Sequence, residues 1–212
     1  MKAVNLFYAD QYKNMNEMTK RGRGRPRSFN PETALAKAAA VFQQKGFDAA
    51  SLDDLAAATN LTRPSLYAAF GNKEALYLAS LQAVARAMEA ELGRIGKTAP
   101  SLEEALRQFY AAALDRYIDG PAGACGCIVM TTGVAASRDL PAVRAYVAVV
   151  LARLDEAVGD LYQHHYHGEK RMRWSKELLA VSTLQTLSIR ARAGTPREAL
   201  DRLVEKVLPA LV

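Results

Sequence analysis

The chain has 212 residues, of which 50% are hydrophobic and 24% charged, a composition typical of a globular protein of one or two domains. No run approaches about 18 uninterrupted apolar residues, and the N-terminus lacks an apolar segment with a small-residue cleavage site, so we expect neither a membrane span nor a secretory signal. Cys125 and Cys127 are the only cysteines and lie too close together to form a disulfide scaffold, which favours a cytoplasmic protein.

The net charge of +6 is concentrated near the N-terminus. Residues 20–27 (KRGRGRPR) carry five positive charges and no negative charge, while the remaining residues together are almost neutral. Such a segment is typical of an arm that contacts a polyanion, and a solubilising tail is the alternative. Because residues 1–29 are polar, basic and interrupted by Gly and Pro, we predict a flexible basic arm there. Met15 and Met18 are alternative translation starts, and the true start codon stays open.

The first predicted helix begins after Asn30, a good N-cap residue, with Pro31 at the first helical position. Apolar residues then recur at i, i+3, i+4 and i+7 (Leu35, Ala38, Ala39 and Phe42), which indicates an amphipathic helix. Gly46 is predicted to end it.

Two short helices follow. Ser51 and Asp54 have the spacing of a capping box and open the first of them. Asn60 suits a tight turn because Asn tolerates a positive φ, and Thr62 then caps a helix that extends to Phe70. Helix, tight turn and helix form the helix-turn-helix arrangement, whose second helix enters a DNA groove.

The rest of the chain is predicted to be helical, without a convincing strand or internal repeat. Helices are expected from Asn72 to a break at 96–100, from Ser101 to about Tyr117, over 127–136, over 141–162, over 174–192, and from Thr195 to the C-terminus. The fold class is therefore all-α, with a small N-terminal three-helix unit and a larger helical body.

Residues 31–78 resemble the DNA-binding domain of TetR-type transcriptional regulators. The matching elements are residues 42–47 (FQQKGF), 51–56 (SLDDLA) and 62–76 (TRPSLYAAFGNKEAL). The resemblance implies a helix-turn-helix domain over 30–78 and a regulatory ligand-binding and dimerisation domain over 79–212. It also implies a cytoplasmic homodimer that acts as a repressor and leaves a palindromic operator when a small, mostly apolar effector binds. The family often has Gly and His where this chain has Pro64 and Ala69, so the polar DNA contact of a His is not expected here.

The predicted DNA contacts centre on the turn that begins the helix over 62–70. Arg63 matches the acceptor pair of guanine in the major groove, and a phosphate contact is the alternative. Lys73 resembles the phosphate-anchoring lysine of the family. In the arm, the sequence RGRP resembles an AT-hook, whose two arginines, here Arg23 and Arg25, enter a narrow A·T minor groove. The full set of DNA-binding candidates is Arg23, Arg25, Ser51, Thr62, Arg63, Pro64, Ser65, Tyr67 and Lys73.

Two further sets of candidates lie in the body. The helices that would surround a family-type ligand pocket carry Phe109, Tyr110, Ala113, Tyr117, Cys127, Met130 and Tyr146, although such a stripe is more often core. The last two helices have apolar positions suited to burial on two sides, and the resemblance implies that they form a four-helix bundle between subunits. The dimer candidates are Leu178, Val181, Leu184, Leu200, Leu203, Val204, Val207 and Leu208.

Several alternatives stay open. Cys125 and Cys127 are candidates for sensing oxidants or electrophiles, if a helix N-terminus lowers a thiol pKa, although Cys127 also suits a small buried position. The cluster His164–His167 is a candidate metal sensor if the helix extends that far. A further alternative for the whole chain is an architectural protein that binds A·T-rich DNA without a ligand. We find no Gly-rich phosphate loop, nucleophile elbow or HExxH motif, so we expect neither an enzyme nor a cofactor. The effector, the operator and the choice between repression and activation cannot be read from the sequence.

Overall fold

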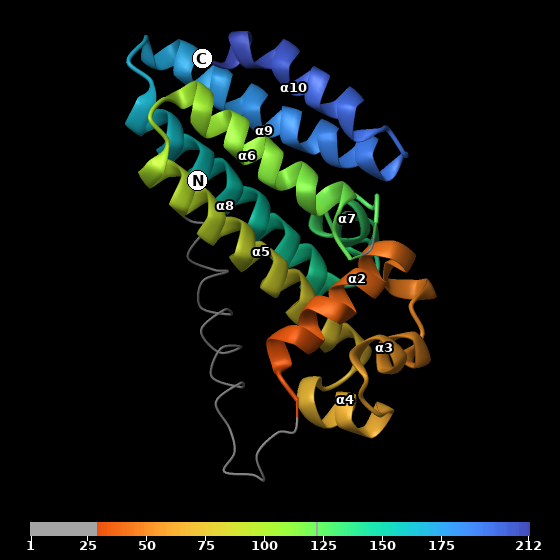
Figure 1. Ribbon diagram of the computed structural model, residues 1–212. Coiled ribbons are helices and arrows are strands. Elements are labelled where there is room, and N and C mark those ends of the chain that lie inside the picture. Colours follow the sequence, from red (N-terminus) through yellow and green to blue (C-terminus); the bar gives the residue numbers. More distant parts are fainter. Residues whose placement is uncertain (1–28, 122) are drawn as a thin grey trace.

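The computed structural model describes residues 29–121 and 123–212 (Figure 1). Nearly all of the predicted basic arm, including Arg23 and Arg25, lies outside these described residues. Within them the secondary structure is helical and contains no strand, which confirms the all-α prediction. A small unit of three helices lies at one end of a bundle of long helices, and the C-terminal end of the chain lies at the other end (Figure 1).

The N-terminal unit consists of α2 (Pro31–Ala49), α3 (Leu52–Thr59) and α4 (Arg63–Phe70). Its three predicted caps are confirmed. The Asn30 side chain accepts hydrogen bonds from the backbone N–H groups of residues 32 and 33, at 2.8 and 3.2 Å. Ser51 and Asp54 form a reciprocal capping box, and Thr62 accepts from the backbone N–H of Ser65 at 3.3 Å. The helix starts are therefore fixed by local chemistry.

Two positive-φ residues shape this unit. Asn60 has φ 57° and ψ 37° and makes the left-handed turn between α3 and α4 that the sequence predicts. Gly46 has φ 80° and ψ 174°, which is not helical, but a further short turn continues to Ala49. The regular helix that begins at Pro31 therefore ends at Gly46 as predicted, and the kink there separates it from the last turn of α2.

The body is built from five long helices: α5 (Lys73–Thr98), α6 (Leu102–Ile118), α8 (Pro141–His165), α9 (Lys170–Arg192) and α10 (Arg197–Leu211). They lie roughly along one another in Figure 1. A π-helix, η1 (Val129–Gly133), and the short α7 (Val134–Ala136) connect α6 to α8 beside α2. Because α5 runs without a break through residues 78 and 79, one continuous helix joins the N-terminal unit to the body.

Helix α5 ends at Thr98, within the predicted break at 96–100. Other predicted boundaries differ from the structure. Helix α9 begins at Lys170 rather than at Trp174. The helix predicted over 127–136 is largely a π-helix that begins only at Val129, because Gly126 (φ 67°) and the hydrogen bond from the Cys127 N–H to Ser188 hold the preceding segment in a non-helical path.

An aromatic cluster joins the N-terminal unit to the body. The buried rings of Phe42 and Tyr77 meet edge to face with centroids 4.7 Å apart, and the Phe47 ring lies 5.3 Å from that of Tyr77. The Tyr77 hydroxyl donates to Oγ1 of Thr132 in η1 at 2.9 Å. Burial raises the pKa of Tyr77 to about 12, so this hydroxyl is a donor at neutral pH. Helices α2, α5 and η1 are thus tied at one point.

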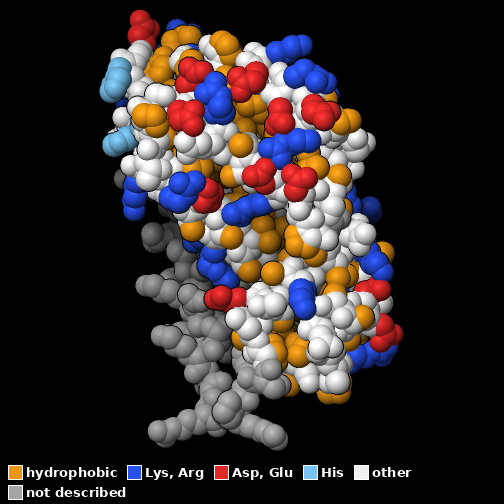
Figure 2. Space-filling view, in the orientation of Figure 1, with side chains coloured by type: hydrophobic (Ala, Val, Ile, Leu, Met, Phe, Trp, Pro, Cys, Tyr) orange, Lys and Arg blue, Asp and Glu red, His pale blue; other side chains and the backbone are white. Residues whose placement is uncertain are grey.

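Ion pairs fasten α10 to α6. Arg107 on α6 contacts Glu205 at 3.1 Å, and Arg197 on α10 contacts Asp115 at 2.7 Å. On the face shown in Figure 2, cationic and anionic side chains are interleaved rather than gathered by sign. This part of the body therefore presents no extended surface of a single charge to a polyanion.

Candidate nucleic-acid interface and cavities

The outward face of α4 is the strongest candidate for a nucleic-acid interface. Leu66 is buried against the neighbouring helices, with 2% of its surface exposed. Arg63 and Pro64 are exposed, and so is Tyr67, with 47% of its surface accessible. A helix of eight residues cannot be stable alone, so α4 depends on α3 and α5 for its position. The packing leaves its polar N-terminal turn free to contact a groove.

Arg63 is paired with a carboxylate that the sequence analysis did not single out. Its Nε donates to Oδ1 of Asp53 on α3 at 2.7 Å, and its Nη2 donates to Oδ2 of the same carboxylate. This two-pronged pairing raises the pKa of Arg63 above its ordinary value. Asp53 and Arg63 are ten residues apart, so only the angle between α3 and α4 brings them together. An anion that binds Arg63 must share or replace Asp53.

The hydroxyl groups among the DNA-binding candidates already form hydrogen bonds within the N-terminal unit. Oγ of Ser51 donates to Oδ2 of Asp54 at 2.8 Å as part of the capping box. The Thr62 and Ser65 hydroxyls lie 2.9 Å apart and share one hydrogen bond. Hydroxyl oxygens retain further hydrogen-bonding capacity, so these contacts order the turn without preventing contact with a phosphate.

Lys73, at the start of α5, lies between α5 and the end of α2. Its Nζ donates to the backbone carbonyl of Asp48 at 3.2 Å and lies 4.6 Å from the centroid of the Phe47 ring. An ammonium group has three donors, so two remain for other partners. The geometry gives Lys73 a structural contact in addition to its predicted phosphate contact.

The predicted ligand residues do not come together in one cavity. Phe109, Tyr110, Ala113, Tyr117, Cys127 and Tyr146 are buried, and Met130 is half-buried. Tyr110 is a core residue whose hydroxyl donates to the carbonyl of Ala180 at 3.0 Å. Met130 lines one cavity, and Tyr117 and Cys127 line another.

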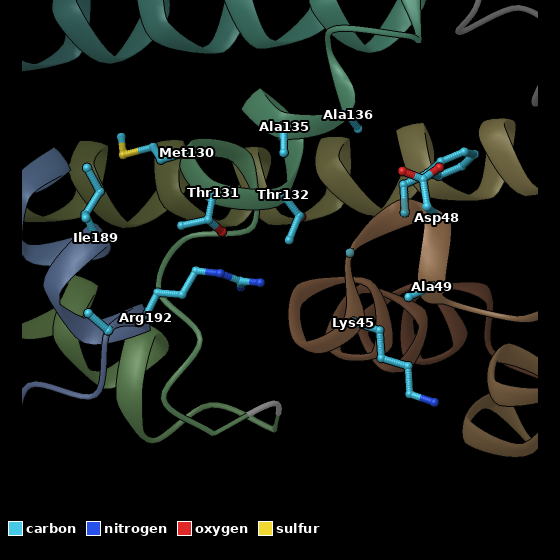
Figure 3. Close-up of a pocket in the computed structure, with 13 residues that line it drawn as sticks. Lys45, Asp48, Ala49, Met130, Thr131, Thr132, Ala135, Ala136, Ile189 and Arg192 are labelled. Carbon is cyan, nitrogen blue, oxygen red and sulfur yellow. The ribbon is translucent and has the colours of Figure 1, made fainter.

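The first cavity, here called the α2–η1 cavity, has a volume of about 630 Å³ and lies between the end of α2 and the helices η1, α7 and α9. Figure 3 shows the Arg192 side chain reaching from α9 into this space, below Thr131 and Thr132 of η1. The guanidinium of Arg192 donates to the carbonyl of Gln43 at 2.8 Å and to that of Cys125 at 3.2 Å. Arg192 therefore links α9 to α2.

The second cavity, here called the α2–α5 cavity, has a volume of about 550 Å³ and lies on another side of α2. Its walls come from α2, α5, the end of α6 and the segment that precedes η1. Both cavities therefore lie between the N-terminal unit and the body, where a bound molecule can change how the two are arranged.

Cys127 has an environment that disfavours a thiolate. Cys127 is buried, and burial raises the pKa of its thiol above the ordinary value. The lowered pKa considered from sequence is therefore wrong for Cys127, because η1 begins two residues later and burial outweighs the nearby backbone donors. Its backbone N–H donates to Oγ of Ser188 at 2.8 Å, as in a structural residue.

The histidine cluster is divided by a helix end. Helix α8 ends at His165, so His164 and His167 do not share a helical face. The rings of His164 and His165 meet edge to face at 4.8 Å. Among the described residues, no group of three or more His, Cys, Asp or Glu side chains could hold a metal ion.

Most of the predicted dimer residues lie in the core of their own chain. Val181, Leu184, Leu200, Val204 and Leu208 are buried within the single chain, while Leu203 and Val207 are half-buried. Leu178 differs, because 54% of its surface is exposed. Leu179, in the same predicted apolar stretch, is 50% exposed, and sequence reasoning missed Trp174 on the same helix, which is 66% exposed. This exposure could not be predicted from the sequence, because the packing of α9 decides which of its apolar positions face outward.

The described helices include none with the length and apolar character needed to cross a membrane. The fold, with a capped helix-turn-helix whose second helix presents a polar turn, defines a helix-turn-helix protein of the nucleic-acid-binding class.

Residues 34–80 match the family model described as bacterial regulatory proteins, tetR family, and the chain belongs to this family. It is 41% identical over 113 residues to the HTH-type transcriptional repressor ComR of Escherichia coli, and 36% identical over 107 residues to the HTH-type transcriptional repressor BdcR of the same organism. Each match covers 50% of this chain, and the chain spans about half of each relative, 52% and 54%.

A solved structure extends the similarity to most of the chain. It is that of a cysteine mutant of the TetR family transcriptional regulator CifR in complex with 26-base-pair double-strand operator DNA. The TM-score is 0.76 at 26% identity, with coverage of 89% of this chain and 100% of the other. The helical body is therefore similar in fold to that of a regulator bound to its operator.

Proposed function

We propose that the protein is a cytoplasmic transcriptional repressor that binds a palindromic operator as a homodimer and is released by a small, mostly apolar effector. In this proposal residues 30–78 form the DNA-binding domain and residues 79–212 the regulatory and dimerisation domain, with no enzymatic activity. The family, the repressors ComR and BdcR, and the operator complex of CifR support it. The single observation that carries it is the exposed polar turn of α4, held on a unit that matches the family model.

In this proposal α4 enters the major groove. Arg63 exchanges the Asp53 carboxylate for a guanine edge or a phosphate, and Tyr67 reaches the sugar-phosphate backbone. The hydroxyls of Thr62, Ser65 and Ser51 and the ammonium of Lys73 contact phosphates around it. Arg23 and Arg25 add contacts in the minor groove.

The dimer is proposed to form through the exposed apolar side of α9, with contributions from α10. Trp174 and Leu178 lie one turn apart on α9, and both are more than half exposed in the single chain. Leu203 and Val207 of α10 are only partly covered. A twofold axis at this surface would place two copies of α4 on half-sites about 34–36 Å apart, or a multiple of that spacing.

DNase footprinting of the region around the gene that encodes the protein tests the proposal. A short protected palindrome is expected from the wild type. Arg63→Ala is expected to weaken operator binding by about tenfold or more and to relax the base preference at one position of each half-site. An unchanged affinity and base preference in this variant would show that α4 does not read the operator. Protection spread over A·T-rich DNA would favour an architectural protein instead.

A further inference from the structure

We propose that the α2–α5 cavity is the effector site and that it binds a small apolar carboxylate. This inference rests on the proposed function, because it assigns the place and the chemical class of the molecule that releases the DNA. It is carried by three features of the cavity: apolar walls of small side chains, a buried hydroxyl without a well-aligned hydrogen bond, and cationic groups at the rim.

The walls of the cavity are apolar and small. Helix α2 contributes Leu35 and three alanines (Ala36, Ala39 and Ala40), and α5 contributes Ala83, Val84 and Ala87. Alanines on two facing helices leave room that larger side chains would fill. The resulting volume of about 550 Å³ lies within the range of small-molecule sites, which is about 300–1,000 Å³. A compact hydrocarbon or aromatic group fits such walls.

One buried hydroxyl in this cavity has only a weak partner. Tyr117 lines the cavity with only 1% of its surface exposed, and its hydroxyl has no well-aligned hydrogen bond among the described residues, the thiol of Cys127 being its polar neighbour. Burial raises the pKa of Tyr117 well above its ordinary value, so the hydroxyl keeps its proton. A buried polar group without a partner destabilises the fold, so such groups call for an explanation. A carboxylate oxygen in the cavity would accept a hydrogen bond from this hydroxyl and satisfy the group.

The charges at the rim favour an anion. Among the described residues that line the cavity, Arg86 and Arg116 are accompanied by a single carboxylate, that of Glu32. Arg116 is held at the wall, because its Nη2 donates to the backbone carbonyl of Ala87 at 3.4 Å. A guanidinium forms strong charge-assisted hydrogen bonds with carboxylates, and five N–H donors leave capacity beyond the one used. The ligand head group would therefore lie between Tyr117 and Arg116.

The cavity is lined from both sides of the joint between the N-terminal unit and the body. At one edge Nε2 of Gln43 on α2 donates to the carbonyl of Gly126, and Arg192 of α9 binds the Gln43 carbonyl at 2.8 Å. Both Gln43 and Gly126 line the cavity. A ligand that fills the space beside them acts directly on the contacts that hold α2 to the body. Loosening these contacts would allow α4 to move relative to α4 of the second subunit.

The α2–η1 cavity also has alanines and two cationic residues in its lining, but its polar groups are paired. Its threonine hydroxyls are satisfied, because Thr131 donates to the carbonyl of Cys127 at 2.6 Å and Thr132 to that of Ile128 at 3.1 Å. Lys45 at its edge is paired with Asp54. No buried polar atom without a partner is found among its described lining residues. This cavity therefore provides the matched control.

The test is isothermal titration calorimetry of the full chain with phenylacetate, cinnamate and octanoate, each compared with its primary amide. We expect saturable binding of at least one carboxylate and weaker binding of its amide. Tyr117→Phe is expected to raise the Kd of that carboxylate by about tenfold or more, since a hydrogen bond to a charged group is lost. Arg116→Gln is expected to weaken binding in the same direction, and Ala36→Leu to reduce it by filling the space. Met130→Ala, in the α2–η1 cavity, should leave the Kd unchanged.

A second measurement separates a ligand contact from a structural role. Tyr117→Phe removes a buried hydroxyl whose only neighbour is a weakly hydrogen-bonding thiol, so its thermal unfolding midpoint is expected to equal or exceed that of the wild type. A purely structural tyrosine would show a lowered midpoint. The inference is overturned if no carboxylate binds saturably at millimolar concentration, or if Tyr117→Phe and Ala36→Leu bind it as the wild type does.

Operator binding without ligand, measured for the same variants, distinguishes this inference from the proposed function. Variants that bind the operator normally but are no longer released by the carboxylate support both the effector site and the repressor proposal. If the wild type binds a carboxylate through Tyr117 but no operator is found, the cavity stands as a ligand site and the repressor proposal fails. If the operator is bound but carboxylates neither bind nor release it, only the effector site is wrong.

Discussion

Arg63 and Asp53 form an ion pair on the surface that we propose for DNA. The effect of this pair on DNA binding depends on whether the guanidinium of Arg63 prefers the Asp53 carboxylate or the DNA. A carboxylate beside phosphates is repelled by them, and it competes for the donors of Arg63. We therefore expect the pair to weaken binding to any DNA and to favour sites where Arg63 gains a guanine edge in exchange. In this proposal Asp53 discriminates between sequences.

Asp53→Asn tests this competition. The variant is expected to bind both operator and unrelated DNA more tightly, and to gain more on unrelated DNA, so that the ratio between the two falls. The measurement is fluorescence anisotropy with both duplexes over a range of salt concentrations.

Asp160→Asn is the matched control for this variant. It removes the same charge from an exposed position on α8, close to the end of that helix that lies away from α4. If Asp160→Asn raises the affinity as much as Asp53→Asn does, the effect comes from net charge and not from the pairing with Arg63.

At the scale of single elements, the capping box of α3 is a pH-dependent contribution to stability. Hydrogen bonds from Lys45 and Ser51 hold the pKa of Asp54 well below its usual range. A carboxylate whose pKa is lower in the folded state stabilises the fold above its unfolded pKa of about 4, and this contribution is lost as the pH falls through the folded value.

Asp54→Asn is therefore expected to lower the free energy of unfolding at neutral pH, and this difference should shrink as the pH falls below about 4. Chemical unfolding at neutral pH and at a pH below about 4, followed by circular dichroism, measures this difference in the free energy of unfolding. Asp139→Asn, an exposed aspartate outside the N-terminal unit, should show a much smaller difference. A loss of stability that is equal at both pH values would mean that the carboxylate charge of Asp54 is not what stabilises α3.

The helix starts could be predicted because each depends on residues three or four positions apart. Asn30, Ser51, Thr62 and Asn72 all cap the helices that they were expected to cap. Ser101 accepts from the Glu104 N–H as expected, while the Glu104 carboxylate binds Gln108 and Arg107. The π-helix was not predicted, and it lies in contact with helices that are distant in the sequence. The same holds for the pair Arg63–Asp53 and for both cavities, which exist only once α2 has packed on the body.

At the scale of the whole molecule, the exposed apolar side of α9 is the feature that a single chain does not explain. Trp174 and Leu178 bury little within their own chain, whereas the neighbouring Val181 and Leu184 are core residues. Substitutions on the two sides of α9 therefore have different consequences for assembly and for folding.

Leu178→Glu is expected to convert the dimer into a monomer, because it places a charge in an apolar interface, and to weaken operator binding strongly while the far-ultraviolet circular dichroism spectrum stays unchanged. Light scattering coupled to size-exclusion chromatography gives the mass. Glu205→Gln, at an exposed position of α10, should remain dimeric. A Leu178→Glu protein that is still a dimer would place the interface elsewhere.

The continuity of α5 has a mechanical consequence. A helix of 26 residues is about 39 Å long, so a tilt of about 5° at one end moves the other by about 3 Å. That displacement is close to the spacing of about 3.4 Å between successive nucleotides along one DNA strand. Since α5 is one continuous helix, a ligand that tilts one wall of a cavity by a small angle can move α4 out of register with the DNA by one base. A small movement at the ligand site would then be large enough to release the DNA.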